Sequence, residues 1–140
     1  MPILRGEAQE VRDAIYAEVN YHAAYEPMRC VRTKRWSYIR RFDHGAHPIL
    51  PNCDDSPSKT LWLDHGWNEL PPLEEVLYDL VFDPNERNNL IDDPTMAAVA
   101  NEMRGRLQAW MQSTQDPLLH GSVPAPPGAK LDDPGAISPT

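Results

Sequence analysis

The sequence has little cysteine, no long apolar segment and no excess of positive charge, and each of these absences excludes a class of protein. Only two cysteines, Cys30 and Cys53, occur in 140 residues. They exclude a disulfide framework and leave open whether the chain has one bridge or two free thiols. No apolar run approaches the ~20 residues that span a bilayer, and the first residues lack the apolar stretch of about 7–15 residues found in signal peptides. We therefore expect no membrane contact from this sequence, and its localisation stays open.

The net charge of −8 argues against a protein whose whole surface binds nucleic acid or another polyanion. Hydrophobic residues make up 41% of the chain and charged residues 24%, which is ordinary globular usage and excludes wholesale disorder. Proline is abundant, with 15 residues, and it gathers in 43–73 and after residue 116. We therefore expect one domain over 1–117 with a long loop at 43–73, followed by an extended proline-rich tail at 118–140.

Positive charge is nevertheless concentrated in one short segment. Six of the 13 basic residues fall between residues 29 and 41, and no acidic residue interrupts them. They are Arg29, Arg32, Lys34, Arg35, Arg40 and Arg41. Basic residues interleaved with Trp36, Tyr38 and Phe42 are typical of a surface that binds single-stranded nucleic acid or an anionic substrate. The same pattern is typical of an exposed strand whose arginine stems lie over aromatic rings, and the sequence leaves both interpretations open.

Alternation of apolar and polar residues predicts strands, and a wider apolar period predicts one helix. Alternating runs occur at 14–19, 28–33, 36–42 and 75–80, and only two residues separate the middle two, which predicts an antiparallel hairpin. From residue 95 to about 113 the apolar residues recur in a single stripe. They are Met96, Val99, Met103, Leu107, Trp110 and Met111. The predicted fold is α+β: a small antiparallel sheet of about four strands with one long C-terminal helix packed across it.

Two Asp-Pro pairs look like helix starts. Asp83 and Asp93 each precede a proline, and an aspartate there suits the N-cap because the first helical position needs no N–H. Glu86 follows Asp83 by three residues, as in a capping box. These acids thereby have a structural explanation, which weakens the case for them as paired catalytic carboxylates.

The sequence contains no assembled catalytic or metal-binding motif. Potential metal ligands gather in the loop, but neither Cys-x-x-Cys nor His-Glu-x-x-His spacing is present to hold a metal ion. They are His44, His47, Cys53, Asp54, Asp55, Asp64 and His65. Cys30 lies close to arginines that would lower a thiol pKa, yet its position in a strand is more typical of a small buried residue. A small metal-dependent hydrolase is therefore only a third hypothesis.

Several short segments occur together in a characteristic order. They are Tyr-His-Ala-Ala-Tyr-Glu-Pro-Met-Arg (21–29), Trp-Ser-Tyr-Ile-Arg (36–40), Leu-Tyr-Asp-Leu (77–80), Asp-Pro-x-Glu (83–86), Asn-Leu (89–90), Arg-Leu-x-x-Trp (106–110) and Asp-Pro (116–117). In this order the segments resemble the C-terminal subdomain of sulfatases, and most closely that of the N-sulfoglucosamine sulfohydrolase (heparan N-sulfatase) type. The resemblance implies the same small antiparallel sheet and long helix that the residue patterns predict.

The sequence departs from the pattern of that family in three ways. Ser37 stands where a lysine is common, and Val76 stands where an acid is common. The third departure is larger, because neither Cys30 nor Cys53 begins the Cys-x-Pro-x-Arg motif whose first residue becomes formylglycine. The resemblance thus implies the last quarter of a sulfuric ester or sulfamate hydrolase, inactive alone. It implies no cofactor in this chain, although the parent family uses calcium and formylglycine.

The resemblance also implies partners and site residues. In the family this subdomain docks against a large catalytic α/β domain, which here would lie in the same polypeptide or in a separate chain, and it helps to wall the substrate cleft. By position in the motif, His22, Tyr25 and Arg29 are expected to face a sulfated sugar. Family members are often exported or lysosomal. The competing hypothesis is a small binding module that holds an acidic partner, either nucleic acid or a sulfated glycan, through the basic hairpin at 29–41.

Overall fold

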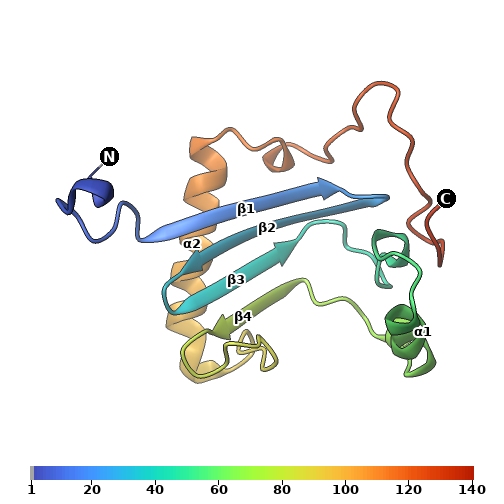
Figure 1. Ribbon diagram of the computed structural model, residues 1–140, viewed down its shortest axis with the longest axis horizontal. Helices are drawn as coiled ribbons and strands as arrows, with labels where there is room; N and C mark the ends of the chain where they lie inside the picture. The colour runs from blue at the N-terminus through green and yellow to red at the C-terminus, as the bar shows by residue number, and fades with distance from the viewer. Residues whose placement is uncertain (1) are drawn as a thin grey trace.

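The computed structural model describes residues 2–140 and contains a four-stranded antiparallel sheet with one long helix behind it (Figure 1). The strands are β1 (Ala14–Tyr21), β2 (Tyr25–Thr33), β3 (Trp36–Arg41) and β4 (Glu75–Asp79), in the spatial order β1-β2-β3-β4. Each strand pairs with its neighbour in the sequence, so the sheet is a simple meander. The predicted α+β fold, a four-stranded antiparallel sheet with one long helix, is confirmed.

The turn between β2 and β3 forms without glycine or asparagine because Thr33 supplies its hydrogen bonds. The Thr33 hydroxyl accepts from the backbone N–H of Trp36 at 2.9 Å and from that of Arg35 at 3.3 Å, as in turns closed by serine or threonine. The resulting register pairs residue 30 with 39 and residue 31 with 38. Since successive strand residues point to opposite faces, the first pair lies on one face of the sheet and the second on the other.

The long helix α2 (Ala97–Ser113) follows a short 3-10 turn at Pro94–Met96 and packs on the face that carries residues 31 and 38. Asp93 caps this start, because its side chain accepts the N–H of Thr95 at 2.8 Å. The predicted apolar stripe of the helix meets the buried strand residues. The largest core residues are Val31, Tyr38, Leu77, Met103, Leu107 and Met111. The helix prediction is therefore confirmed in both its extent and its buried face.

The segment predicted as a long loop, 43–73, contains a helix that sequence analysis missed. Helix α1 (Pro57–Asp64) begins at the N-cap Ser56, whose side chain accepts the N–H of Lys59 at 3.2 Å. Ser56 before a proline is the same kind of start signal as an Asp-Pro pair. The helix has no apolar stripe, and Leu61 and Trp62 remain exposed, so periodicity did not reveal it.

Residue Asp83 closes a turn and starts no helix. Its carboxylate accepts the N–H groups of Arg87 and Asn88, both at 2.8 Å. Glu86 has a positive φ of 53° and pairs with Arg32 at 2.6 Å, so it closes no capping box. The interpretation of Asp83 and Glu86 as an N-cap pair is wrong, although both acids do have structural roles.

The proline-rich tail turns back and runs towards the tip of the hairpin formed by β1 and β2 (Figure 1). The backbone N–H of Asp132 donates to the Ala23 carbonyl at 2.9 Å, which ties the tail to the hairpin tip. The tail therefore contributes to the surface around the residues that the sequence singles out as a site.

None of the helices within residues 2–140 is long and apolar enough to cross a membrane.

Candidate functional site

The three residues predicted to bind substrate lie on the β1–β2 hairpin, but in different environments. The pairing of the two strands is irregular between Val19 and Tyr21, after which Tyr21 pairs with Tyr25 at the end of the hairpin. His22 follows directly in the connection and is exposed. Tyr25 is half-buried at the start of β2, whereas Arg29, four residues further along, is buried. The hairpin thus carries an exposed tip and a buried base.

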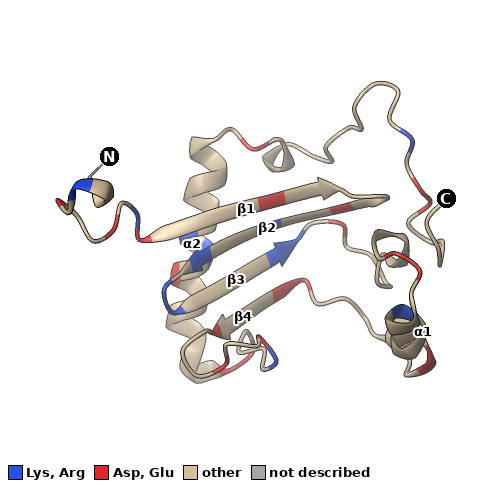
Figure 2. Ribbon diagram, in the orientation of Figure 1, with Lys and Arg blue, Asp and Glu red and all other residues tan. Residues whose placement is uncertain are grey.

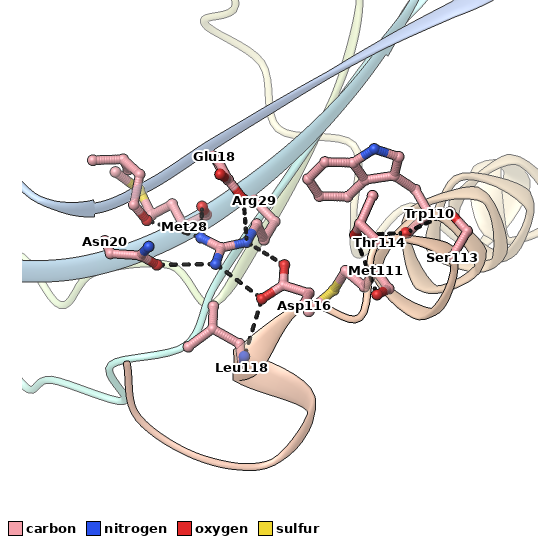
Figure 3. A network of polar contacts seen from close by, with 11 residues as sticks. Glu18, Asn20, Met28, Arg29, Trp110, Met111, Ser113, Thr114, Asp116 and Leu118 are labelled. Atoms are coloured by element: carbon pink, nitrogen blue, oxygen red, sulfur yellow. Dashed lines mark hydrogen bonds and ion pairs between the residues drawn. The ribbon is translucent and has the colours of Figure 1, made fainter. Parts of the chain in front are cut away.

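Arg29 is enclosed, and every N–H of its guanidinium has an acceptor within the chain (Figure 3). Nε donates to one carboxylate oxygen of Asp116 at 2.5 Å. Nη2 donates to the other Asp116 oxygen at 3.0 Å and to Asn20 Oδ1 at 2.9 Å. Nη1 donates to the carbonyls of Val19 at 3.0 Å and Met28 at 2.9 Å. All five donors that an arginine side chain possesses are therefore used by this chain itself.

Asp116 forms a bidentate ion pair with Arg29 and thereby holds the chain just after α2 against the sheet. Burial alone would raise the pKa of the Asp116 carboxyl, but the hydrogen bonds from Arg29 and from the backbone N–H of Leu118 outweigh burial and lower that pKa. Removing one partner of such a pair leaves an uncompensated buried charge. Arg29 thus has a structural role in this chain, and its predicted contact with a sulfated sugar stays a prediction.

Tyr25 and Tyr21 hold the backbone of one tail residue, Val123, between them. The Tyr21 hydroxyl donates to the Val123 carbonyl at 2.5 Å, and the Tyr25 hydroxyl accepts the Val123 N–H at 3.1 Å. The centres of the two rings lie 4.8 Å apart. Within residues 2–140, no acceptor takes the proton of the Tyr25 hydroxyl, and no hydrogen bond is made by the His22 imidazole. The tip therefore presents two polar groups that are able to donate to a ligand.

The basic segment is neutralised by acids from other parts of the chain, and Figure 2 shows acidic segments interspersed among the basic ones. Each of its six basic residues has a carboxylate within 4.0 Å. The pairs are Arg29–Asp116, Arg32–Glu86, Lys34–Glu10, Arg35–Asp79, Arg40–Glu75 and Arg41 with both Glu26 and Asp43. Binding of nucleic acid relies on cations that are available to phosphates. The pairing lowers the net positive charge of this segment, which weakens the competing hypothesis.

Cys30 lacks the environment of a nucleophile. Burial raises the pKa of its thiol, and Glu86 adds to that rise, while the opposing effect of Arg32 is smaller. A thiol with a raised pKa stays protonated at neutral pH and reacts slowly. Cys30 and Cys53 are both free thiols, so the structure contains no bridge between them.

The candidate metal ligands of the 43–73 segment do not converge. His44 pairs with Glu74 at 2.6 Å, whereas the rings of His47 and His65 each contact a different backbone carbonyl. In the part of the chain that the structure describes, no three His, Cys, Asp or Glu side chains gather in a way that would hold a metal ion. The residues present therefore do not fit the calcium that the resemblance implies for a whole sulfatase.

The residue that sequence analysis missed is Asp116. The Asp-Pro pair at 116–117 was visible, and its carboxylate does accept the N–H of Leu118 at 3.0 Å, as a cap would. Its second role, as the partner of Arg29, joins positions 87 residues apart. No local pattern reports such a long-range pair. A buried arginine in a strand requires an acidic partner, but the sequence contains 21 acidic residues and does not indicate which of them is the partner.

Comparison with known proteins points to sulfatases. No protein-family model matches the chain. The chain is 27% identical over 132 residues to an ulvan-active sulfatase from Formosa agariphila, an alignment that covers 90% of this chain and 26% of the relative. It is 28% identical over 138 residues to a delta 4,5-hexuronate-2-O-sulfatase from Bacteroides thetaiotaomicron, covering 96% of this chain and 23% of the relative. The chain thus spans about a quarter of the length of these curated relatives.

Solved structures agree with the sequence matches. A 2-O GAG sulfatase aligns with 98% of this chain at a TM-score of 0.58 and 25% identity, and the alignment covers 24% of that protein. The match therefore includes the sheet, α2 and most of the tail as one unit. Together the comparisons support a relationship to the C-terminal portion of sulfatases, which are hydrolases.

Proposed function

We propose that this chain is the C-terminal portion of a sulfatase-family hydrolase and walls one side of the substrate cleft of a catalytic α/β domain. The observation that carries the proposal is the extent of the match: 98% of the chain aligns with a sulfatase structure, of which it covers only 24%. A fold that matches as a whole, yet makes up a quarter of its relatives, is typical of a subdomain that works with another domain. That catalytic domain lies in the same polypeptide or in a separate chain.

The proposal includes the absence of sulfatase activity in the chain by itself. Its sequence has no Cys-x-Pro-x-Arg or Ser-x-Pro-x-Arg motif to supply formylglycine. Residues 2–140 also bring together no set of carboxylates suited to calcium. We expect the purified chain to release no sulfate from a chromogenic aryl sulfate. Release at a rate proportional to protein concentration would contradict the proposal.

Within the cleft wall, we assign direct contact with the sugar to His22 and Tyr25. His22 is exposed, and the Tyr25 hydroxyl keeps its proton available because it only accepts from Val123. Both groups donate hydrogen bonds of the kind that sulfate and carboxylate oxygens accept, and such charge-assisted bonds are among the stronger ones. Arg29 serves the wall by holding the base of the hairpin to Asp116.

Among sulfatases, we propose the type that acts on N-sulfated glucosamine. The support is the order of the segments at 21–29, 36–40 and 77–90. The two curated relatives are described as an ulvan-active sulfatase and as a hexuronate-2-O-sulfatase, and neither description names N-sulfated glucosamine. The decisive comparison is therefore sulfate release from an N-sulfated glucosamine against release from a 2-O-sulfated disaccharide, measured with the complete enzyme.

The test of the cleft-wall role is a chimera with the delta 4,5-hexuronate-2-O-sulfatase. Deleting the segment of that enzyme that this chain matches should abolish sulfate release from an unsaturated 2-O-sulfated disaccharide, and inserting this chain should restore measurable release. His22→Ala and Tyr25→Phe in the chimera should each lower kcat/KM about tenfold, the value of one lost charge-assisted hydrogen bond. Gln108→Ala, on the exposed side of α2, is the matched control and should change nothing.

The outcomes separate the two parts of the proposal. A chimera as inactive as the deletion would contradict the assignment of the chain to a sulfatase cleft. An active chimera that tolerates both His22→Ala and Tyr25→Phe would contradict the assignment of the site residues alone.

A binding module for an acidic partner is the second candidate. The six basic residues at 29–41 favour it by sequence, but each of them is paired with an acid of the same chain. Binding of single-stranded DNA by the isolated chain, with an affinity that falls steeply as salt rises, would support this alternative. We expect no such binding at physiological salt.

A further inference from the structure

We propose that the face of the sheet opposite α2 is the surface on which the catalytic domain of the sulfatase docks. We name it the open face, and define it by the strand residues that point away from α2. The inference rests on the proposed function, since its occupant is the domain that this function requires. The juxtaposition that carries it is a row of four small or apolar side chains, one from each strand. The row consists of Ala17, Cys30, Ile39 and Val76, which pair in that order across the sheet.

The residues beside this row are also largely apolar. Val19 and Met28 form one neighbouring pair, and Ile15 begins the row on the other side. Ile15 is 52% exposed. A shallow hollow of about 250 Å³ is lined by three residues of the row, by Val19 and Met28, and by the charged residues Glu18 and Arg29. Contiguous apolar surface of this kind marks an interaction site more often than scattered single residues do.

Among residues 2–140, no helix covers the open face. Helix α2 lies behind the sheet, and the tail and α1 lie towards the end of the sheet that carries the β1–β2 connection (Figure 1). Ala17 is exposed, and Cys30, Ile39 and Val76 are only half-buried. An antiparallel sheet can leave one face in water, but that face then carries polar residues at alternate positions. Here the alternate positions in the middle of the sheet are apolar, so the face is built to be covered.

The charges on the open face indicate the chemistry of the partner. Its two arginines, Arg32 and Arg41, lie at the margins of the apolar row, and each is paired within the chain. Arg32 binds Glu86 at 2.6 Å, and Arg41 binds Glu26 at 2.7 Å. Because these two cations are already paired with acids of the same chain, the open face favours an apolar partner surface with few charges at its centre. A polyanion does not fit this description.

The length of the relatives identifies that partner. The two curated sulfatases match 90% and 96% of this chain, but the chain covers only 26% and 23% of them. About three-quarters of each relative therefore lies outside the matched segment. A subdomain of this kind must pack against that remaining part of the enzyme. The catalytic portion of a sulfatase is thus the occupant to which we commit, in preference to a second copy of this chain.

The experiment uses the two native thiols as reporters. The probe is the delta 4,5-hexuronate-2-O-sulfatase produced without the segment that this chain matches, added in trans to the purified chain. Cys30 lies in the apolar row, whereas Cys53 lies in the 43–73 segment and is not part of that row. Binding should slow alkylation of Cys30 at least about tenfold, read by peptide mass mapping, while Cys53 reacts as in the free chain.

Two matched variants sharpen the result. Ala17→Asp places a charge in the middle of the row and should weaken binding of the probe at least about tenfold, because the charge would be buried without a partner. Ala98→Asp makes the same change on the exposed surface of α2 and should alter binding less than about twofold. Both alanines are exposed in the chain alone, so both variants should fold, as unfolding curves would verify.

The outcomes distinguish this inference from the proposed function. If the probe binds while Cys30 is alkylated as fast as in the free chain, or if Ala17→Asp binds as tightly as the native chain, the assignment of the open face is overturned and the proposed function still stands. Protection of Cys30 that rises with the concentration of the chain alone would assign the face to a second copy and overturn the proposed occupant. No binding of the probe would count against the docking surface, whereas the proposed function is judged by the activity of the chimera.

Discussion

The two faces of the sheet are made by the same four strands, yet only one of them is covered by a helix of the described chain. On the covered face, Val31, Tyr38 and Leu77 are fully buried beneath α2. On the open face, the adjacent residues Cys30 and Ile39 are half-buried, and Ala17 is exposed. Alternation along a strand therefore reports that two faces exist, while the presence of an amphipathic helix decides which of them is covered within the chain.

The polar residues of the two faces differ as well. The covered face contains a fully enclosed ion pair, Arg29–Asp116, whose side chains are 0% and 1% exposed. The open face contains the pair Arg32–Glu86, whose side chains are 44% and 27% exposed. The strength of an ion pair depends on its access to water. Removing one partner of the pair should therefore lower the free energy of unfolding more on the covered face than on the open face.

The largest expected effect comes from breaking the enclosed pair. Asp116→Ala should lower the free energy of unfolding by about 3–5 kcal/mol, because it leaves the Arg29 charge buried without a counter-ion. Urea unfolding at neutral pH measures this loss directly. The double variant Arg29→Met with Asp116→Leu should recover part of it, since replacing both partners removes the uncompensated charge.

The matched control is Glu86→Ala on the open face. It breaks the exposed pair with Arg32 and should cost less than about 1 kcal/mol. Equal losses from Asp116→Ala and Glu86→Ala would show that the two faces do not differ in the way that the geometry indicates.

A somewhat smaller effect is expected from the apolar contact between α2 and the sheet. Leu107 is 2% exposed and packs among the core residues, so Leu107→Ala should cost about 2–5 kcal/mol and lower Tm sharply. Its neighbour on the exposed side gives the control, and Gln108→Ala should change stability by less than about 0.5 kcal/mol.

The open face supplies a second control for the same contact. Ile15 is 52% exposed, so Ile15→Ala should cost less than about 1 kcal/mol in the isolated chain, measured by urea unfolding. Comparable losses from Leu107→Ala and Ile15→Ala would mean that the open face is covered in solution.

The sequence allowed most of the fold to be predicted because its elements are governed by local patterns. Strand alternation and the helical stripe placed all four strands and α2, since burial on one side imposes a period on the residues. Helix α1 escaped because its exposed Leu61 and Trp62 follow no apolar stripe, so only the weaker cap signal at Ser56 was present. Where packing does not select residues, periodicity carries no information.

The site was less predictable for the opposite reason, because its contacts are long-range. The motif order identified His22, Tyr25 and Arg29 as a group, but it could not show that Arg29 is enclosed while His22 is exposed. That difference depends on Asp116, which is 87 residues away in the chain. Likewise, the six basic residues form a positive run in sequence only, because their acidic partners come from distant segments.

The smallest expected effect concerns pH, and it again separates the faces. Three carboxyl groups on the covered face have lowered pKa values. Hydrogen bonds from Arg35 lower the pKa of Asp79. For Glu75 and Asp116, burial acts to raise the pKa but is outweighed by their arginine partners. A carboxyl group with a lower pKa in the folded state than in the unfolded state stabilises the fold above the unfolded value, which is about 4.

We therefore expect the free energy of unfolding to be constant near neutral pH and to fall as pH decreases below about 4 through the folded pKa values. Urea unfolding at intervals between pH 6 and pH 2 measures this slope. Asp116→Asn removes one titrating group from the covered face and should give a shallower decline, measured from its own stability at pH 6. Asp133→Asn, in the exposed tail, should leave the slope unchanged. Stability that rises towards pH 3, or a slope that Asp116→Asn does not reduce, would show that Asp116 does not hold a lowered pKa on the covered face.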